Sequence, residues 1–157
     1  MNAGTLAGQA LLLDTCVYID RMQGRAPMKL NDLLSARLVN HSTVAIQELV
    51  HIVGLLDPSD RRTDGAVETV GVQIKSMRSH RIRTPDADVL GRAALLSGVL
   101  CRLQGYDKDN KLRALHDCVL FLQALKEGLV LLTANIGDYD PLLQMIPQGR
   151  VLFYRNV

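Results

Sequence analysis

Short apolar runs alternate along the chain with longer segments in which apolar residues recur at helical spacing. The run at 11–13 leads into Asp14 and the run at 129–133 ends in Thr133, a pattern typical of strands buried on both faces. Briefer extended segments are expected at 39–42 and 81–83, and a last strand at 150–155. Strands that alternate with helices predict a parallel α/β sheet.

Helices are expected in the segments between these strands. Their bounds follow from apolar spacing, from capping residues and from glycine or proline stops. The predicted helices are 17–22, 30–38, 44–56 capped by Ser42 or Thr43, 66–77, a helix from Asp86 or Asp88 to Gly105, and 111–127. Because the chain has 157 residues and no internal repeat, residues 1–157 are expected to form a single domain.

The composition favours a soluble protein in a reducing compartment. Hydrophobic residues make up 48% and charged residues 22%, and no apolar run is long enough to span a bilayer, so no membrane association is expected. Residues 1–9 place no basic residue ahead of their apolar part, so a secretory signal is not expected. Three cysteines without Cys-x-x-Cys spacing argue against disulfides and structural zinc, which makes the cytoplasm the simplest location. The net charge of +2 does not by itself indicate a nucleic-acid partner.

Four carboxylates occupy positions where the pattern predicts burial. Asp14 directly follows the first strand, and Asp138 comes shortly after the strand that ends at Thr133. Glu48 and Asp117 lie in predicted helices, and the residues three and four positions from each are mostly apolar. Because ligands gather at the carboxyl ends of parallel strands, we expect the functional site at this edge of the sheet.

These acids predict a divalent metal centre. Two carboxylates ~5 Å apart repel by about 3 kcal/mol at an effective dielectric constant near 20, so a group of four needs shared protons or a cation. Arg113 and His51 are the basic side chains near the two helical faces. Hard cations prefer oxygen ligands, and Mg²⁺, or Mn²⁺ in its place, suits a site that keeps waters for a phosphate substrate.

The same residues carry a resemblance to a known family. The matching segments are Asp14-Thr15, Ser42-Thr43 followed by Glu48-Leu49, Asp117 in an alanine-rich helix, and residues 132–139 with the pattern Thr-x-Asn-x-x-Asp-aromatic. In this order and at these separations they are similar to the motifs of PIN-domain ribonucleases. Within that group the chain resembles the VapC-type toxins of bacterial and archaeal toxin–antitoxin pairs, over the span from Leu11 to Phe153.

The resemblance implies a fold, an activity and a set of partners. The fold would be a three-layer α/β/α arrangement around a mainly parallel sheet, and the activity would be Mg²⁺-dependent endonucleolytic hydrolysis of RNA. A cognate antitoxin protein and a homodimer are implied in the same way. The residues that match the family are Asp14, Glu48, Asp117 and Asp138 as metal-binding catalytic acids, and Thr133 and Asn135 as polar residues that position the substrate.

Basic residues provide candidates for contacts with the RNA backbone. Arg81 and Arg83 are the candidates for positioning substrate, and Arg61, Arg62 and Arg78 are further ones. The basic cluster at 75–83 is equally consistent with a solvated face. The chain departs from the family pattern at Cys16, where asparagine is common, at Gly137, and at Tyr139, where phenylalanine is commoner.

Several plainer interpretations compete with these roles. Asp14 alone could cap the turn that follows its strand, and Glu48 could be a half-exposed helical residue paired with His51. Asp138 could cap the turn before Pro141, although Asp140 is better placed to cap a helix that begins at that proline. The remaining acids near the predicted helices are expected to be capping or solvated residues: Asp86, Asp88, Asp107 and Asp109.

Two alternatives concern the function itself. His116 and Cys118 flank Asp117, but each is rotated by about 100° from it around the helix, so a zinc site built from these three residues is disfavoured. A catalytically silent PIN fold that binds RNA or protein is the main rival to an enzyme, and the presence of all four acids counts against it.

Overall fold

Five parallel strands form the central sheet of the computed structural model, which describes residues 8–157. In spatial order the strands are β3 (Ile82–Arg83), β2 (Val39–Ser42), β1 (Leu11–Leu13), β4 (Val130–Thr133) and β5 (Val151–Phe153). The two apolar runs of the sequence, β1 and β4, lie side by side, with Leu13 opposite Leu132. Their carboxyl ends therefore meet at the same edge, as the sequence predicted.

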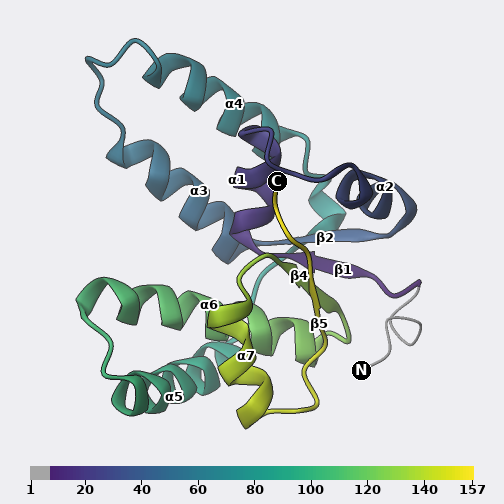
Figure 1. The fold of residues 1–157 in the computed structure, drawn as a ribbon, viewed down its shortest axis with the longest axis vertical. Coiled ribbons are helices and arrows are strands. Elements are labelled where there is room, and N and C mark those ends of the chain that lie inside the picture. The colour runs from purple at the N-terminus through teal and green to yellow at the C-terminus, as the bar shows by residue number, and fades with distance from the viewer. Residues whose placement is uncertain (1–7) are drawn as a thin grey trace.

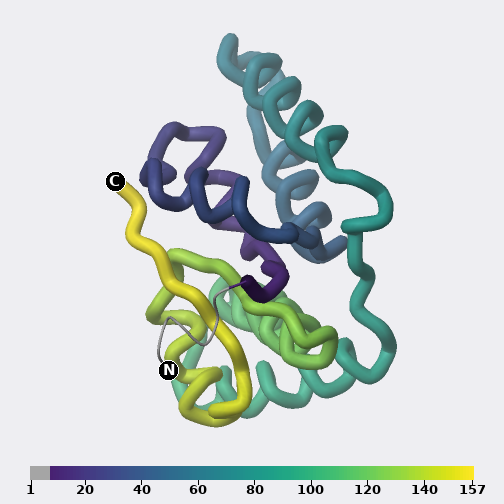
Figure 2. The backbone as a smooth tube through the Cα atoms, turned by 90° about the vertical axis from the view of Figure 1, so that its right-hand side faces the viewer, coloured from purple at the N-terminus to yellow at the C-terminus, as the bar shows by residue number. Residues whose placement is uncertain are grey.

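Helices cover both faces of this sheet and make the three-layer arrangement visible in Figure 1. One layer contains α1 (Thr15–Met22), α2 (Met28–Ala36), α3 (Thr43–Leu55) and α4 (Thr63–Lys75); the other contains α5 (Ala87–Gln104), α6 (Lys108–Lys126) and α7 (Ile136–Met145). The short 3₁₀ helix η2 (Ser79–Arg81) leads into β3. Figure 2 shows α3 and α4 projecting at one end of the molecule and α5 and α6 lying at the other.

The alternation of side chains along β1 explains why two layers of helices pack on one sheet. Leu12 faces the core formed with α5, α6 and α7, whereas Leu11 and Leu13 face the core formed with α1 to α4. In β4, Leu131 faces the first core, and Val130 and Leu132 face the second. A strand that is apolar at every position is therefore required at the centre of the sheet.

The structure confirms the order and type of the elements and corrects several of their ends. Helix α6 begins at Lys108, because Asp107 accepts a hydrogen bond from the backbone N–H of Asn110 at 2.9 Å and so caps it. Helix α4 likewise begins at Thr63, three residues earlier than predicted. Asp86 caps α5 through the N–H of Val89 at 2.9 Å, which decides between the two expected caps. Within residues 8–157, no helix combines the length and apolar character needed to cross a bilayer.

The prediction of a helix that starts at Pro141 is wrong. Helix α7 begins at Ile136, with Asn135 at its N-cap position, and Pro141 lies inside the helix. The rule that places proline in the first turn therefore misplaced the start of this helix by more than one turn. Asp138 consequently lies in the first turn of α7 instead of in a loop. The prediction about a secretory signal concerns residues 1–9, of which residues 1–7 lie outside the described part of the chain.

Candidate active site

Asp14 lies at the junction of β1 and α1, at the carboxyl edge of the sheet, where β1 and the neighbouring β4 both end. Its Oδ1 accepts a hydrogen bond from the backbone N–H of Thr15 at 2.7 Å, and its Oδ2 accepts one from the hydroxyl of Thr133 at 2.6 Å. The Cys16 thiol lies 3.3 Å from the same Oδ2. Asp14 thus caps α1, as the plainer interpretation held, and is also fixed by the residue that ends β4.

The environment of Asp14 disfavours its charge. The side chain is buried, and desolvation raises the pKa of its carboxyl, while the nearby Glu48 raises that pKa further. The donors around it are a hydroxyl, a backbone amide and a thiol, so they offset the shift only in part. A buried carboxylate without a cationic partner is a frequent property of functional sites.

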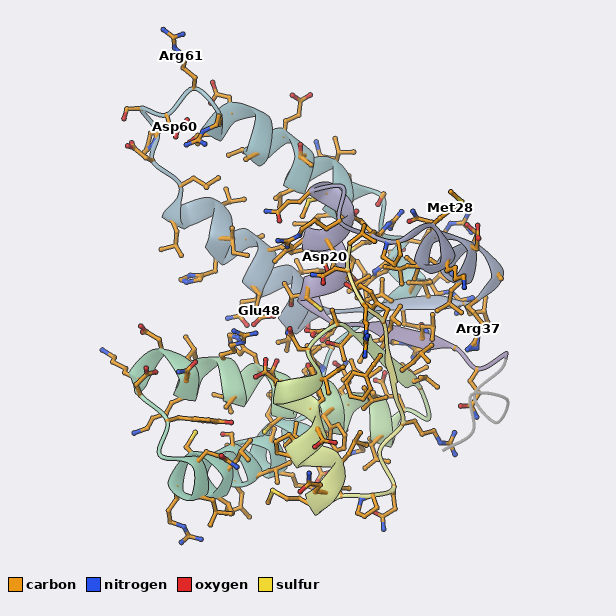
Figure 3. The ribbon with its side chains drawn as sticks, viewed as in Figure 1. Asp20, Met28, Arg37, Glu48, Asp60 and Arg61 are labelled. Carbon is orange, nitrogen blue, oxygen red and sulfur yellow. The ribbon has the colours of Figure 1, made fainter. Side chains whose placement is uncertain are left out.

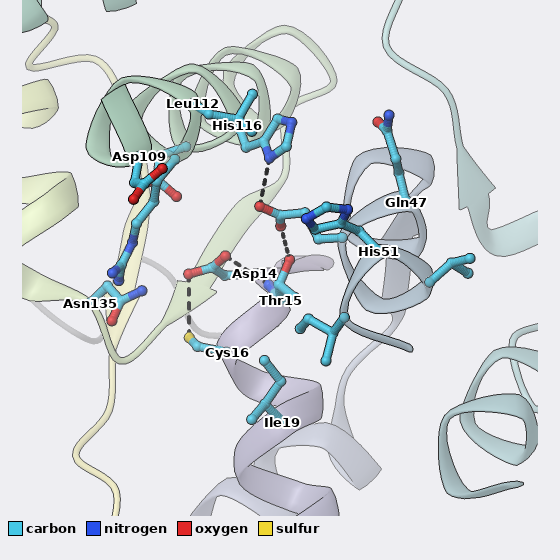
Figure 4. Close-up of a pocket in the computed structure, with 15 residues that line it drawn as sticks. Asp14, Thr15, Cys16, Ile19, Gln47, His51, Asp109, Leu112, His116 and Asn135 are labelled. Atoms are coloured by element: carbon cyan, nitrogen blue, oxygen red, sulfur yellow. Dashed lines mark hydrogen bonds and ion pairs between the residues drawn. The ribbon is translucent and has the colours of Figure 1, made fainter. Parts of the chain in front are cut away.

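Glu48 reaches the same region from α3, and its two oxygens are held by different elements. Its Oε1 lies 2.8 Å from Nδ1 of His116 on α6, and its Oε2 accepts a hydrogen bond from the Thr15 hydroxyl (Figure 4). Its histidine partner is therefore His116 and not His51, which corrects the alternative pairing. Ser42 caps α3 through the N–H of Val44 at 3.1 Å and so fixes the start of the helix that carries Glu48.

Asp117 extends from the middle of α6 and is the most strongly perturbed acid of the group. Burial raises its pKa well above the ordinary value, and Asp14, Asp138 and Glu48 raise it further through charge repulsion. Arg113, one turn earlier on the helix, opposes this shift. Its Oδ1 accepts a hydrogen bond from the Tyr139 hydroxyl at 3.2 Å. Asp14, Glu48 and Asp117 line one cavity, and Asp117 and Asp138 line the adjoining one, so the four predicted carboxylates come together.

Asp138 completes the group from the first turn of α7. Its carboxylate forms an ion pair with Arg113, in which Nη2 lies 2.9 Å from Oδ2. Thr133 positions the loop before this helix, since its hydroxyl accepts a hydrogen bond from the backbone N–H of Asn135 at 3.0 Å. The two polar residues predicted beside the acids are thus adjacent to them, and Thr133 links Asp14 to the start of α7.

An open cavity of about 760 Å³ lies between α3 and α6. Asp14, Glu48, Asp117 and Asn135 line it, whereas Asp138 lines a smaller neighbouring cavity together with Arg113 and Asp117. Figure 3 shows Glu48 pointing into the space between the two helices. The acids therefore surround two adjoining openings, with Arg113 and Asp117 at the boundary of both.

The structure adds three residues for which the sequence predicted no role in this site. Thr15 and His116 hold Glu48, and Tyr139 donates to Asp117. Tyr139 departs from the phenylalanine that is commoner in the family, and a tyrosine at this position adds one hydroxyl donor. Sequence spacing gave no signal for the contact between His116 and Glu48, because 68 positions separate them.

The arginines predicted to position substrate lie elsewhere. Arg81 belongs to η2 and Arg83 to the edge strand β3, where its Nε lies 3.5 Å from Oδ1 of Asn40, and neither lines the cavity. Arg61 points away from the body at the tip of the hairpin formed by α3 and α4 (Figure 3). Arg113 is the arginine that lines the cavity itself. Contacts of Arg81 and Arg83 with RNA stay a prediction.

The donor chemistry of the site suits a hard divalent cation, although the side chains are turned toward protein donors. Within residues 8–157, no group of three His, Cys, Asp or Glu side chains has the arrangement of a metal site. Glu48 is engaged by His116, and Asp138 by Arg113. The buried, mutually repelling carboxylates nevertheless supply the oxygen ligands and the negative potential that Mg²⁺ requires. The residues therefore fit the predicted ion in chemistry.

The sheet order, the two helical layers and the acids at the carboxyl edge define a PIN-like three-layer α/β/α fold. No protein-family model matches the sequence, and no curated protein matches it. Solved structures do share the fold. VapBC2 from Rickettsia felis, bound to a promoter DNA fragment, matches with a TM-score of 0.63 at 14% identity, covering 92% of this chain and 98% of the other.

Two further solved structures give the same result. FitAcB from Neisseria gonorrhoeae matches with a TM-score of 0.63 at 18% identity, covering 92% of this chain and 96% of the other. VapBC-5 from Mycobacterium tuberculosis, of the VapBC family of toxin–antitoxin systems, matches with a TM-score of 0.57 at 18% identity and covers 94% and 98% of the two chains. The resemblance to VapC-type toxins predicted from the motifs is thus confirmed at the level of the fold.

Proposed function

We propose that this chain is a Mg²⁺-dependent endoribonuclease that hydrolyses RNA phosphodiester bonds and serves as the toxin of a toxin–antitoxin pair. The observation that carries this proposal is the convergence of four acids from four elements on one edge of the sheet, with the carboxyls of Asp14 and Asp117 buried and raised in pKa. Two buried carboxylates without a cationic side chain bonded to them, Asp14 and Asp117, cost stability, and cation binding would offset that cost.

Asp14, Asp117, Asp138 and Glu48 are the residues that would hold the ion, and Mn²⁺ would substitute for Mg²⁺. When bound, the cation would polarise the scissile phosphate and lower the pKa of the attacking water. Asp14 would be a rigid ligand, because Thr133 and the Thr15 amide fix its two oxygens. Asp138 would have to exchange its ion pair with Arg113 for the cation.

Arg113 would then become available to the substrate. Its side chain is 56% exposed and lies at the boundary of the two openings, so a guanidinium released from Asp138 can bind a phosphate oxygen without moving far. Glu48, held from two sides, would order a water beside the reacting phosphate. The cavity of about 760 Å³ is large and open enough for a single-stranded segment or loop of RNA.

The partners and the location follow from the same proposal. The solved structures that share the fold include VapBC complexes of toxin–antitoxin systems, which supports an antitoxin as a partner of this chain. A homodimer and a cytoplasmic location would fit such a toxin. A neighbouring gene for a small DNA-binding protein would support the toxin role, and its absence would favour a solitary nuclease.

A cleavage assay on a panel of tRNAs and structured RNAs tests the enzymatic part. We expect endonucleolytic products with Mg²⁺ or Mn²⁺, none with EDTA, and none from Asp117→Asn in either condition. Identical cleavage by wild type and Asp117→Asn would assign the activity to a contaminant and contradict the proposal. RNA binding by a wild-type protein that never cleaves would favour the catalytically silent module, which the present orientation of Glu48 and Asp138 toward protein donors also permits.

A further inference from the structure

Glu48 is the acid of the site that contacts both walls of the cavity. Its Oε1 lies 2.8 Å from Nδ1 of His116 on α6, and its Oε2 accepts from the Thr15 hydroxyl at the start of α1. The carboxylate and the imidazole are equally sheltered, since each side chain is 21% exposed. A single carboxylate in the lining of the cavity thus connects α3, α1 and α6; its two partners, Thr15 and His116, are labelled in Figure 4.

The charges determine which group donates in the contact with His116. An ionised carboxylate only accepts hydrogen bonds, so Nδ1 of His116 must carry the proton that lies between the two side chains. The neutral ring is then in the Nδ1–H form, and its Nε2 is left without a proton. The Nδ1–H tautomer of His116 depends on the contact with Glu48, because removal of Glu48 leaves the ring free to adopt the other tautomer.

We propose that His116 is a positioning residue for Glu48, which it holds at the cavity where the metal ion would bind. This inference rests on the proposed function. A glutamate side chain has several rotatable bonds, and ordering it costs side-chain entropy. Two donors on two different elements remove that freedom before the ion binds, as partners of metal-binding carboxylates do in other metalloproteins.

His51 provides a matched control. It lies three positions after Glu48 on α3 and lines the same cavity, but its ring forms no hydrogen bond or ion pair with the described residues. A general effect of losing an imidazole from the cavity would appear equally in His51→Ala and His116→Ala. The positioning role predicts a large effect in His116→Ala alone.

The first measurement is the affinity for Mn²⁺ by calorimetry on the full chain. We expect His116→Ala to weaken binding by roughly 10- to 100-fold, and His51→Ala to leave it unchanged. His116→Asn should restore most of the affinity, because the asparagine amide nitrogen takes the place of Nδ1. Equal affinity in wild type and His116→Ala, or equal losses in both alanine variants, would overturn the assignment.

The second measurement needs neither metal nor activity. At pH 8, where an ordinary histidine is neutral, ¹⁵N-detected correlation spectra should show His116 in the Nδ1–H form in wild type and in the commoner Nε2–H form in Glu48→Ala. An Nε2–H ring in wild type would refute the contact. If wild type shows the Nδ1–H form yet does not bind Mn²⁺, the proposed function fails while the contact itself stands.

Discussion

Two aspartates on the same segment show how differently a fold uses a buried carboxylate. Asp14 and Asp20 stand at the start and near the end of α1, and they are 3% and 2% exposed. Asp20 has a cationic partner, since Nη2 of Arg25 lies 2.8 Å from it, and the Tyr154 hydroxyl donates to it at 2.7 Å. Asp14 receives its hydrogen bonds from Thr133, Cys16 and a backbone amide, none of which is charged.

Asp14 and Asp20 are equally buried, and they differ in whether a cationic side chain compensates the charge of the carboxylate. The contacts of Asp20 tie α1 to the C-terminal segment, where the N–H of Val157 also donates to the carbonyl of Arg25 at 3.0 Å. Asp14 keeps an uncompensated charge, and Glu48 nearby makes that charge still less favourable. The charge of a buried acid with its own cation is compensated within the fold, whereas an acid without one is available to an external cation.

The largest expected effect separates these two roles by activity. Asp14→Asn should lower kcat for RNA cleavage by about 10³-fold, because loss of a ligand removes several kcal/mol of transition-state stabilisation. Asp20→Asn should cleave at the wild-type rate when assayed below its melting temperature. Single-turnover kinetics on the same RNA measure both variants. An equal loss of cleavage rate in both would show that the two aspartates do not differ in function.

The second effect is stabilisation by the metal itself. Mn²⁺ at 100 times its dissociation constant should raise the free energy of unfolding of wild type by about 2.7 kcal/mol. The same amount of Mn²⁺ should raise the free energy of unfolding of Asp20→Asn equally and that of Asp14→Asn only slightly. Addition of EDTA should reverse each increase. Thermal unfolding with and without Mn²⁺ measures this, and an equal gain in Asp14→Asn would show that the ion binds elsewhere.

The third effect is the structural cost at Asp20. Asp20→Asn should lower the free energy of unfolding by about 2 kcal/mol, less than for a fully buried pair because Arg25 is 46% exposed and can turn to solvent. Urea unfolding of metal-free protein at pH 7 measures this loss. A Tyr154→Phe variant serves as the control, since it removes one donor to Asp20 and leaves the ion pair in place.

The smallest effect concerns pH. Burial raises the pKa of Asp14 above the ordinary 3.8, so the unfolded chain loses this proton at a lower pH than the folded chain does. The free energy of unfolding therefore falls as the pH rises from the unfolded-state pKa to the folded-state pKa. The penalty is absent below the unfolded pKa and complete above the folded one. The free energy of unfolding of metal-free Asp14→Asn should therefore rise relative to that of wild type as the pH increases from 4 to 7. A constant difference across this range would contradict the direction of the shift.

The sequence predicted the fold well because its strongest signals are local. The apolar runs at β1 and β4 could be placed from burial alone, and the polar residues that follow them located the functional edge. Helix ends were less predictable. Asp107 caps α6, which begins three residues before the expected start, and α7 begins at Ile136, soon after β4 and well before Pro141.

The site was predictable in its acids and not in their partners. Glu48 and Asp117 could be identified because a charged residue on an apolar helical face is unusual in a structural role. The contact between His116 and Glu48 depends on how α3 and α6 face each other across the cavity, which no local pattern encodes. The ion pair of Arg113 with Asp138 has the same origin, although Arg113 was already expected near the acids.

The position of Asp14 at the first turn of α1 has a practical consequence. Its Oδ1 caps the helix, and asparagine caps helices about as well as aspartate, whereas alanine costs about 1 kcal/mol. An amide at position 14 would thus remove a negative charge while keeping the acceptor for the Thr15 N–H. The Asn variant is accordingly the form suited to trapping uncleaved RNA for structure determination, in a chain that folds like the wild type.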